Sequence, residues 1–404
     1  MSTSLLYHAF GVRGYRYVRT DYVEGDVVFT IKQTRNSYRC PVCGSADVIG
    51  RGRSCRRFRT ASIARKPVYL SLAIPRIECR CCGAVRQVKV SFADPRVAYT
   101  KSFRQYVLDL SHAMTIKDVA CHFGVSWDVV KEIVKDDLQR RFDKPKLKRL
   151  RQIAIDEISV GKGHRYLTVV LDLETGRIVY VGHGKGGDAL ADFWKRLRRC
   201  GAKIAAVATD MSPAYIDAVT THLPEAVLVF DRFHVMKLFN DKLSDLRREL
   251  HRAAKEGLEK DVLKGTRWLL LKRPENLDAS RDEHERLEEA LRLNAPLATA
   301  YYLKEELGEL WEQDDQEEAE AFLLDWIHRA ESTDIRMLHQ FARTLRFHAH
   351  GLLAYYEYAI STGPLEGTNN KIKTMKRQAY GFRDQEFFKL KILALHESKY
   401  ALVG

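Results

Sequence analysis

The sequence predicts a multidomain α/β protein, because successive stretches of its 404 residues differ in composition and in apolar spacing. The N-terminal third carries two paired-cysteine motifs and most of the excess positive charge. After Arg151 the apolar residues form short β-rich runs, and further on their spacing becomes helical. A chain of this length exceeds one ordinary core and favours two to four domains.

The formal net charge of +14 is unevenly distributed. Residues 1–151 hold 30 Lys and Arg against 13 Asp and Glu, whereas the remainder holds 37 against 40. A localised basic excess is what neutralisation of nucleic-acid phosphates requires. We therefore expect the N-terminal third to bind nucleic acid, and a merely solvated basic surface is the alternative.

Composition also bears on the compartment. With 45% hydrophobic and 30% charged residues, the chain is typical of a soluble globular protein. No apolar stretch approaches the ~20 residues that a membrane span needs, and residues 1–4 lack the features of a signal peptide. We expect a cytoplasmic protein.

Four of the eight cysteines form two matching motifs, each a CxxC followed by glycine. This spacing lets two thiolates bind one ion, and two such turns supply tetrahedral ligation of a structural Zn²⁺. A reducing cytosol favours metal over disulfide, with redox chemistry as the alternative. Cys81 lies inside the second motif and could replace Cys79. The expected ligands, in a zinc ribbon within residues 1–95, are Cys40, Cys43, Cys79 and Cys82.

The segment between the two cysteine motifs is rich in cations. Phosphate binding needs such residues, so we expect the ribbon itself to touch DNA. The cations are Arg51, Arg53, Arg56, Arg57, Arg59, Arg65 and Lys66.

Helical spacing with a turn at Gly124 predicts a helix-turn-helix domain within residues 96–143. Ser126 is expected to cap the second helix. Trp127 and Lys131 would then lie near the start of that helix, where recognition helices contact base edges. A plain helical hairpin is the alternative.

The basic run that follows, residues 144–151, is interpreted as a linker because its proline discourages helix continuation. Its cations lie beside the helix-turn-helix and are expected to bind DNA as well. They are Lys146, Lys148 and Arg149.

Five β-rich runs and one helical segment after residue 151 have the order of an RNase H-like α/β domain. Three strands, the second and third joined by a hairpin, precede the helix and two further strands. The first part of this core spans residues 152–249, and residues 357–404 supply its C-terminal helices. The strands are expected at 153–158, 166–173, 177–181, 204–209 and 226–230, and the helix at 189–199.

Two aspartates are strand-borne in this arrangement. Asp156 lies within an apolar run and Asp210 ends the run that forms the neighbouring strand, so both would lie at one edge of the sheet. Alternation sends Glu157 to the opposite face. A carboxylate inside an apolar strand is costly unless it is paired or metal-bound, whereas Asp210 could be a strand-terminal cap.

A third carboxylate, Glu366, follows Gly363-Pro364, which is a helix-start signal. Helical spacing places Asn370, Lys373 and Arg377 on the same face, where we expect them to grip the DNA backbone. An exposed first-turn glutamate stabilised by the helix dipole is the alternative for Glu366. Hard oxygen ligands suit Mg²⁺, and two ions ~3.5–4 Å apart support in-line displacement at phosphorus without a protein nucleophile.

On these motifs the chain resembles the DDE transposases of bacterial insertion sequences, and specifically the ISL-three family. The resemblance extends over nearly the whole chain. Besides the zinc ribbon and the helix-turn-helix, it rests on residues 154–157, 209–211, 231–234, 365–373 and 380–382.

The resemblance implies that Asp156, Asp210 and Glu366 are the catalytic triad that binds two Mg²⁺ ions, for which Mn²⁺ can substitute. It implies that Lys373 fills the basic position seven residues after the glutamate. It also implies that Asp231 and His234 form a DxxH element that supports the active site. Residues 250–356 would be an all-helical insertion like the family's.

The predicted function is that of a transposase that binds the terminal inverted repeats of its insertion sequence. Metal-dependent cleavage and strand transfer into target double-stranded DNA would follow, in the nucleoid of a bacterial cytoplasm. Two element ends require at least a homodimer. The alternatives are a catalytically silent, transposase-derived DNA-binding regulator and a metal-dependent DNA nuclease without joining activity.

Overall fold

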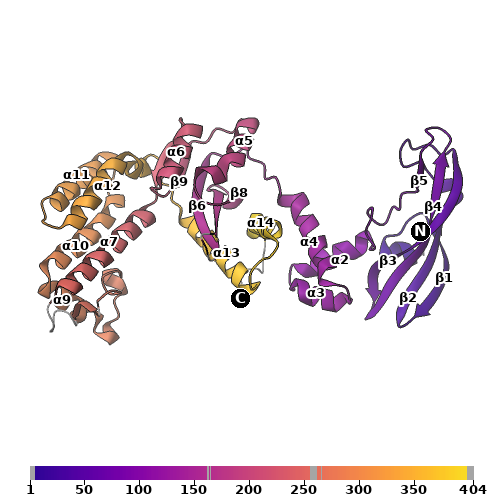
Figure 1. Cartoon of the computed structure of the whole chain (residues 1–404), viewed down its shortest axis with the longest axis horizontal. Helices are drawn as coiled ribbons and strands as arrows, with labels where there is room; N and C mark the ends of the chain where they lie inside the picture. The colour runs from indigo at the N-terminus through magenta and orange to yellow at the C-terminus, as the bar shows by residue number, and fades with distance from the viewer. Residues whose placement is uncertain (1–4, 162, 164, 255–261, 265, 398–404) are drawn as a thin grey trace. The chain divides into compact units, whose positions relative to one another are not determined.

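The computed structural model describes residues 5–161, 163, 165–254, 262–264 and 266–397 (Figure 1). These residues form two compact units, one ending at Asp143 and the other running from Lys144 to Glu397. Each unit holds a β-sheet and α-helices, which confirms the predicted multidomain α/β class. No helix within the described residues combines the length and apolar character that a membrane crossing requires.

The first unit opens with a sheet in which β1, β2, β4 and β3 are neighbours in that order and β5 pairs with the end of β4. Burial alternates along much of β4, because successive side chains point to opposite faces and one face packs against the core. That face packs against α1 through Leu6, Phe10, Phe29 and Leu70. The elements are α1 Leu5–Phe10, β1 Tyr15–Val23, β2 Asp26–Gln33, β3 Val48–Ile63, β4 Lys66–Cys79 and β5 Val85–Gln87.

Three helices complete the first unit, and each begins at a side-chain cap. These are α2 Lys101–Ser111, α3 Ile116–Phe123 and α4 Trp127–Phe142. The hydroxyls of Thr100, Thr115 and Ser126 accept N–H groups of the first turns. Gly124 ends α3 in the left-handed conformation, with φ of 62°. The predicted helix-turn-helix and the cap at Ser126 are confirmed.

Hydrogen bonds of the Arg59 side chain link these helices to the sheet. Its side chain is 5% exposed and donates to the carbonyl oxygens of Thr60 and Val68 on the sheet and of Phe123 at the end of α3. The guanidinium also lies over the ring of Phe103 of α2. The expectation that Arg59 contacts DNA is therefore wrong: β3 turns this residue into the protein, while Arg57 is exposed.

The second unit contains a five-stranded sheet in the order β10-β9-β6-β7-β8. Strands β6, β7 and β8 are antiparallel neighbours, whereas β9 and β10 run parallel to β6. This is the expected RNase H-like order. The elements are β6 Gln152–Gly161, β7 Arg165–Asp172, β8 Arg177–His183, α5 Ala191–Cys200, β9 Ala206–Thr209, α6 Pro213–His222 and β10 Val227–Phe230.

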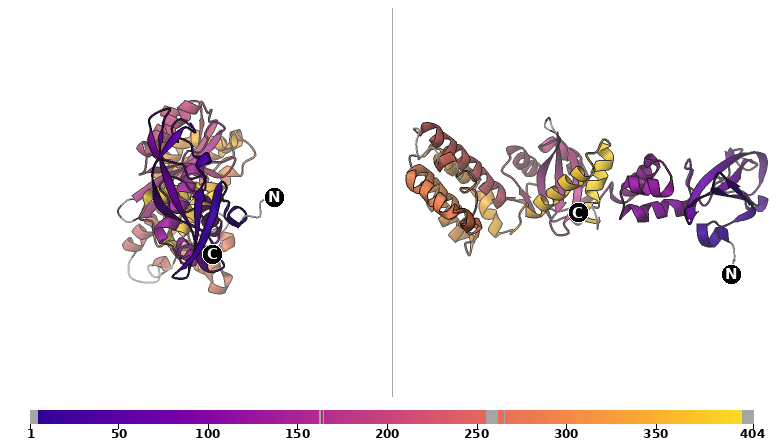
Figure 2. Two further views of the ribbon diagram at one scale, coloured as in Figure 1. Left: turned by 90° about the vertical axis from the view of Figure 1, so that its right-hand side faces the viewer. Right: turned by 90° about the horizontal axis from the view of Figure 1, so that it is seen from below.

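The two faces of this sheet are covered by different helices. Ile153 and Ile155 of β6 pack with Trp194 of α5 and Tyr215 of α6. The even-numbered residues of β6, such as Asp156, lie on the other face of the sheet. There α13 packs against this strand (Figure 2). The C-terminal helices are α13 Gly363–Gln378 and α14 Gln385–Leu393.

A helical domain interrupts the core between β10 and α13. It has its own apolar core, in which Phe239 and Phe341 pack face to edge beside the buried Trp326. The insertion was predicted from residue 250, but α7 enters its core from Val235 onward. The helices are α7 Arg232–Ala253, α9 Glu283–Leu293, α10 Ala295–Leu307, α11 Gln316–Glu331 and α12 Arg336–Leu353.

Single-turn 3₁₀ helices join several of these elements. They lie at Arg35–Ser37, Gly187–Leu190, Pro274–Asn276, Ala279–Arg281, Gly308–Trp311, Ala354–Tyr356 and Leu395–Glu397.

The basic segment at residues 144–151 is anchored to the second unit. Leu147 and Leu150 are buried in the core beneath α5. Arg196 of α5 also donates to the carbonyl oxygen of Pro145. The predicted linker is therefore held in place by its two leucines, and the neighbouring cations Lys146, Lys148 and Arg149 are exposed.

Replacing Arg59 by alanine should loosen the helix-turn-helix from its sheet, because several buried carbonyl oxygens lose their donor. The loss should be about 3 kcal/mol, so that amides of α3 exchange about a hundredfold faster. Hydrogen-exchange mass spectrometry on the full chain measures this. Arg57→Ala, two residues away and exposed, is the control, and equal exchange in both variants would contradict the assignment.

Candidate zinc centre and candidate active site

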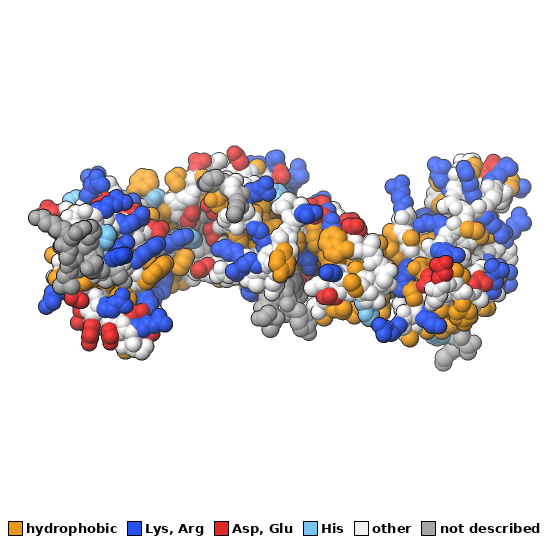
Figure 3. Space-filling model, turned by 60° about the horizontal axis from the view of Figure 1, so that its bottom comes forward, with side chains coloured by type: hydrophobic (Ala, Val, Ile, Leu, Met, Phe, Trp, Pro, Cys, Tyr) orange, Lys and Arg blue, Asp and Glu red, His pale blue; other side chains and the backbone are white. Residues whose placement is uncertain are grey.

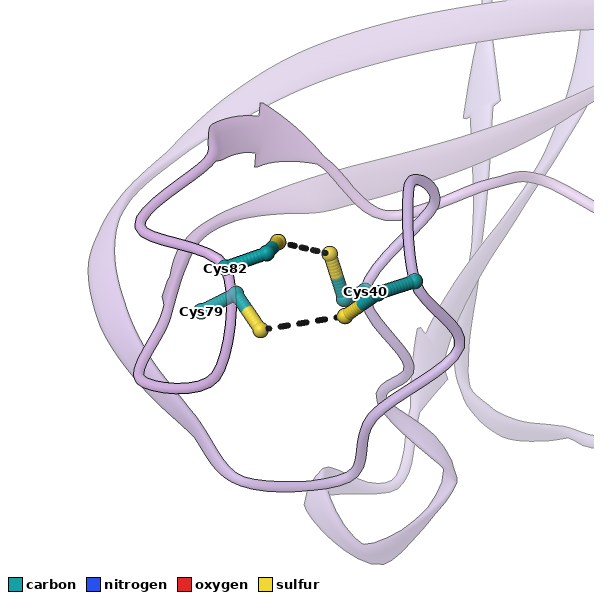
Figure 4. Close-up of side chains that lie close together, drawn as sticks. Cys40, Cys79 and Cys82 are labelled. Carbon is teal, nitrogen blue, oxygen red and sulfur yellow. Dashed lines mark hydrogen bonds between the residues drawn. The ribbon is translucent and has the colours of Figure 1, made fainter.

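The four predicted zinc ligands lie together in the first unit (Figure 4). Among the described residues, Cys40, Cys43, Cys79 and Cys82 form the group whose ligand atoms all lie within 4.8 Å of one another. Sγ atoms of Cys40 and Cys82 are 3.7 Å apart, and those of Cys43 and Cys79 are 3.5 Å apart. Cys81 is exposed and outside the group, which resolves the ambiguity of the second motif.

Local backbone geometry prepares these thiols for a metal. Gly44 and Gly83 follow the motifs with φ of 77° and 68°, and each donates its N–H to the carbonyl oxygen of the first cysteine of its motif. Backbone N–H groups lower the pKa of the thiols of Cys40 and Cys79, and in return hydrogen bonds among the neighbouring sulfurs raise the pKa of Cys43 and Cys82. A thiolate is the form that binds zinc, so the site suits a structural zinc ion.

The sheet register of the second unit brings the two strand-borne aspartates side by side. Ala154 of β6 pairs with Ala208 of the parallel strand β9. Asp210 directly follows β9, and its charge acts on the carboxyl group of Asp156 in β6, so the two side chains lie near one another. The prediction that both lie at one edge is supported by this register.

The same register continues to β10. Phe230 pairs with Thr209, so Asp231 follows β10 at the level where Asp210 follows β9. Asp231 is 2% exposed and accepts the N–H of Thr362, at the start of α13, at 3.2 Å. The fold thus aligns three aspartates across three adjacent parallel strands.

Asp156 is partly buried, and both of its oxygens accept hydrogen bonds. Oδ1 accepts the N–H of Glu157 at 2.7 Å, and Oδ2 accepts Nδ2 of Asn369 at 2.8 Å. Burial raises the pKa of Asp156; the Glu157 N–H and the charge of His234 oppose this rise, and the charge of Asp210 adds to it. Glu157 instead meets the hydroxyl of Tyr215 of α6 at 3.4 Å, as expected of the opposite face.

His234 lies one helical turn after Asp231 and faces the same carboxylates. Its Nδ1 is 3.3 Å from Oδ2 of Asp231. Burial favours the neutral ring, but Asp231 and the charges of Asp156 and Asp210 outweigh it and raise the pKa of His234. Burial likewise acts to raise the pKa of Asp231, yet the contacts with His234 and Thr362 lower it.

Glu366 occupies the first turn of α13 with its side chain exposed. Asn370, Lys373 and Arg377 are exposed on the same helix, as their spacing predicts. The carboxylates of Asp156, Asp210 and Glu366 do not form a group as tight as the cysteine cluster in the part of the chain that the structure describes. The hydrogen bond between α13 and Asp156 comes from Asn369, which lies three residues after Glu366.

Asn369 was not among the predicted site residues. Leu365, Asn369 and Ile372 follow one another at helical spacing, and all three are buried. A polar residue inside this apolar stripe is the signal that the sequence offered. Only the packing of α13 on β6 shows that Asp156 is its partner.

The residues proposed for DNA contact differ in accessibility. Trp127 is 47% exposed at the start of α4, whereas the side chain of Lys131 is 16% exposed and lies near Trp127 and Glu132. Lys146, Lys148 and Arg149 are exposed. Lys and Arg side chains also dominate the visible face of the first unit's sheet domain, at the right of Figure 3.

Three segments of the chain match known transposase domains. Residues 153–392, more than half of the chain, match the family described as "Transposase". Residues 88–137 match the helix-turn-helix domain of transposase family ISL3, and residues 37–82 match the zinc finger of the transposases IS204, IS1001, IS1096 and IS1165. Together with the fold, these matches define the class of protein as a transposase. The chain belongs to the ISL3 family, the ISL-three family that its motifs predicted.

Full-length relatives agree with this assignment. The chain is 32% identical over 390 residues to "Transposase for insertion sequence element IS1001" of Bordetella parapertussis, covering 95% of this chain and 96% of the relative. It is 30% identical over 394 residues to "Transposase for insertion sequence element IS1557" of Mycobacterium tuberculosis (strain CDC 1551 / Oshkosh), covering 91% and 87%. A solved structure, "Drosophila P element transposase strand transfer complex", is similar with a TM-score of 0.42 and 10% identity, covering 76% of this chain and 94% of that one.

The zinc centre predicts one zinc equivalent per chain, measurable by atomic emission on the purified protein. Cys40→Ser and Cys82→Ser should each lose most of the metal, because three thiolates no longer complete the tetrahedron. Cys81→Ser should keep it. Cys79→Ser should lose the metal as well, and loss of zinc in Cys81→Ser together with retention in Cys79→Ser would reverse the assignment of the second motif.

Proposed function

We propose that this transposase cleaves double-stranded DNA at the ends of its insertion sequence and joins the freed 3′ ends to target DNA. The observation that carries the proposal is that Asp156 on β6 and Asp210 directly after the adjacent parallel strand β9 act electrostatically on one another, with α13 bound to Asp156 and carrying Glu366 in its first turn. Water would attack in the cleavage step, and the freed 3′-hydroxyl in the transfer step.

Three carboxylates, Asp156, Asp210 and Glu366, would hold Mg²⁺ or Mn²⁺. Their oxygen atoms are the hard donors that these ions prefer, and the unpartnered buried oxygen of Asn369 beside Asp156 fits the same donor class. A bound pair of ions would activate the attacking oxygen and stabilise the leaving oxygen. The protein's own part is to hold these oxygen donors in place and to orient the DNA.

Asp231 and His234 are proposed as supporting residues. The buried Asp231 carboxylate holds the first turn of α13, and therefore Glu366, at the end of β10. His234 lies within electrostatic reach of Asp156 and Asp210 and offsets part of their mutual repulsion. Neither side chain needs to contact DNA for this role.

The zinc ribbon and the helix-turn-helix would recognise the DNA. Lys and Arg side chains would bind its phosphate backbone. Trp127 is exposed at the start of α4, and the ammonium of Lys131 lies 5.8 Å from the centre of its ring. The backbone contacts would come from Lys146, Lys148, Arg149, Asn370, Lys373 and Arg377. Joining two element ends requires two active sites, so we propose at least a homodimer on DNA.

Asp156→Asn should abolish cleavage and strand transfer on DNA carrying the inverted repeats that flank the gene, with Mg²⁺ present. Loss of a ligand carboxylate should lower the rate by about 10³-fold or more. Gel analysis of cleaved and joined products measures this, with DNA binding by the variant as the control. Cleavage without joining by the intact protein would indicate a nuclease, and binding without cleavage would indicate a regulator.

Lys373→Ala should weaken binding to end DNA uniformly across sequences. Removal of one phosphate contact should reduce the slope of log affinity against log salt concentration by about one. Titrations by fluorescence anisotropy at several salt concentrations measure the slope. Lys195→Ala, whose exposed lysine pairs with Asp192 on α5, is the matched control, and an unchanged slope in Lys373→Ala would remove this residue from the interface.

A further inference from the structure

Asn369 joins the strand that carries Asp156 to the helix that carries Glu366. Its side chain is 5% exposed, and its Nδ2 donates to Oδ2 of Asp156 at 2.8 Å. The other oxygen of Asp156 is held by the backbone N–H of Glu157. The carboxylate is therefore fixed in orientation by two donors, one from its own strand and one from α13.

The second polar atom of the Asn369 amide is unsatisfied. Oδ1 is buried and accepts no hydrogen bond. A buried acceptor without a partner destabilises the fold, so such atoms are rare unless they have another role. Because Oδ1 and Nδ2 belong to one planar amide, this free oxygen lies beside the Asp156 carboxylate.

A purely structural role accounts for Nδ2, which holds Asp156, but not for the unsatisfied Oδ1. Asn369 occupies the apolar stripe of α13 between Leu365 and Ile372, where leucine would bury no unsatisfied oxygen of its own but would take the donor from Oδ2 of Asp156. Asparagine also has a lower helix propensity than leucine. The unsatisfied oxygen and the lower helix propensity are both offset if the amide holds Asp156 and its oxygen binds a cation beside the carboxylates.

We propose that Asn369 is a positioning residue that also supplies a neutral oxygen donor to the Mg²⁺ site. Its Nδ2 orients Asp156, and its Oδ1 adds a hard oxygen without adding a fourth negative charge to the three carboxylates. The inference rests on the proposed function, because it requires that Asp156 binds metal.

Binding of Mn²⁺ to the full-length, zinc-loaded protein tests the proposal, with free Mn²⁺ measured by electron paramagnetic resonance. Asn369→Leu, which suits the apolar stripe, should weaken Mn²⁺ binding about tenfold or more. Asn369→Asp, which restores an oxygen donor, should bind more tightly than the leucine variant. Gln378→Ala, an exposed position at the end of α13, should bind as the unaltered protein does.

Hydrogen exchange of α13 in the same samples separates metal binding from helix packing, since Asn369→Leu should leave that exchange unchanged. Equal Mn²⁺ affinity in Asn369→Leu and the unaltered protein, with binding lost in Asp156→Asn, would overturn the inference and leave the proposed function intact. Binding that is the same in the unaltered protein and in Asp156→Asn would overturn both.

Discussion

The buried carboxylate of Asp231 holds the two ends of the helical insertion together. It stands where the chain leaves β10 for α7, and it accepts the N–H of Thr362, 131 residues later, where the chain returns to the core. His234 lies beside it as an ionic partner, with Nδ1 3.3 Å from Oδ2, and removal of the carboxylate would leave the Thr362 N–H without its acceptor. The start of α13, and with it Glu366, is thereby fixed to the sheet.

The pairing register of the parallel strands positions the other residues of the candidate active site. Parallel pairing of β6, β9 and β10 aligns Asp156, Asp210 and Asp231 across the sheet. Asp156 accepts N–H groups of Glu157 and Asn369, Asp210 accepts that of Ser212, and Asp231 accepts that of Thr362 where the core closes. Three negative charges so close together repel one another, and His234 and the N–H donors to Asp156 offset part of that repulsion.

Local patterns predicted the elements well because each depends on neighbouring residues. The strands of the core, the caps at Ser126 and Gly124, and the cysteine pairs all follow from spacing within a few residues. Predictions failed where a side chain's environment is set by a distant segment. Arg59 belongs to a basic run that looks solvent-facing, yet α3 covers it, and Leu147 and Leu150 hold a presumed linker in the core.

The sequence by itself determined the family, the zinc ligands, the helix-turn-helix and the positions of the strand-borne aspartates, because motif spacing and period-two alternation are properties of contiguous residues. Only the tertiary structure decided that Asn369 meets Asp156, 213 residues apart, and that Asp231 serves closure of the core. Such pairings depend on how helices pack on a sheet, and no local period encodes which buried polar groups then come within hydrogen-bond distance.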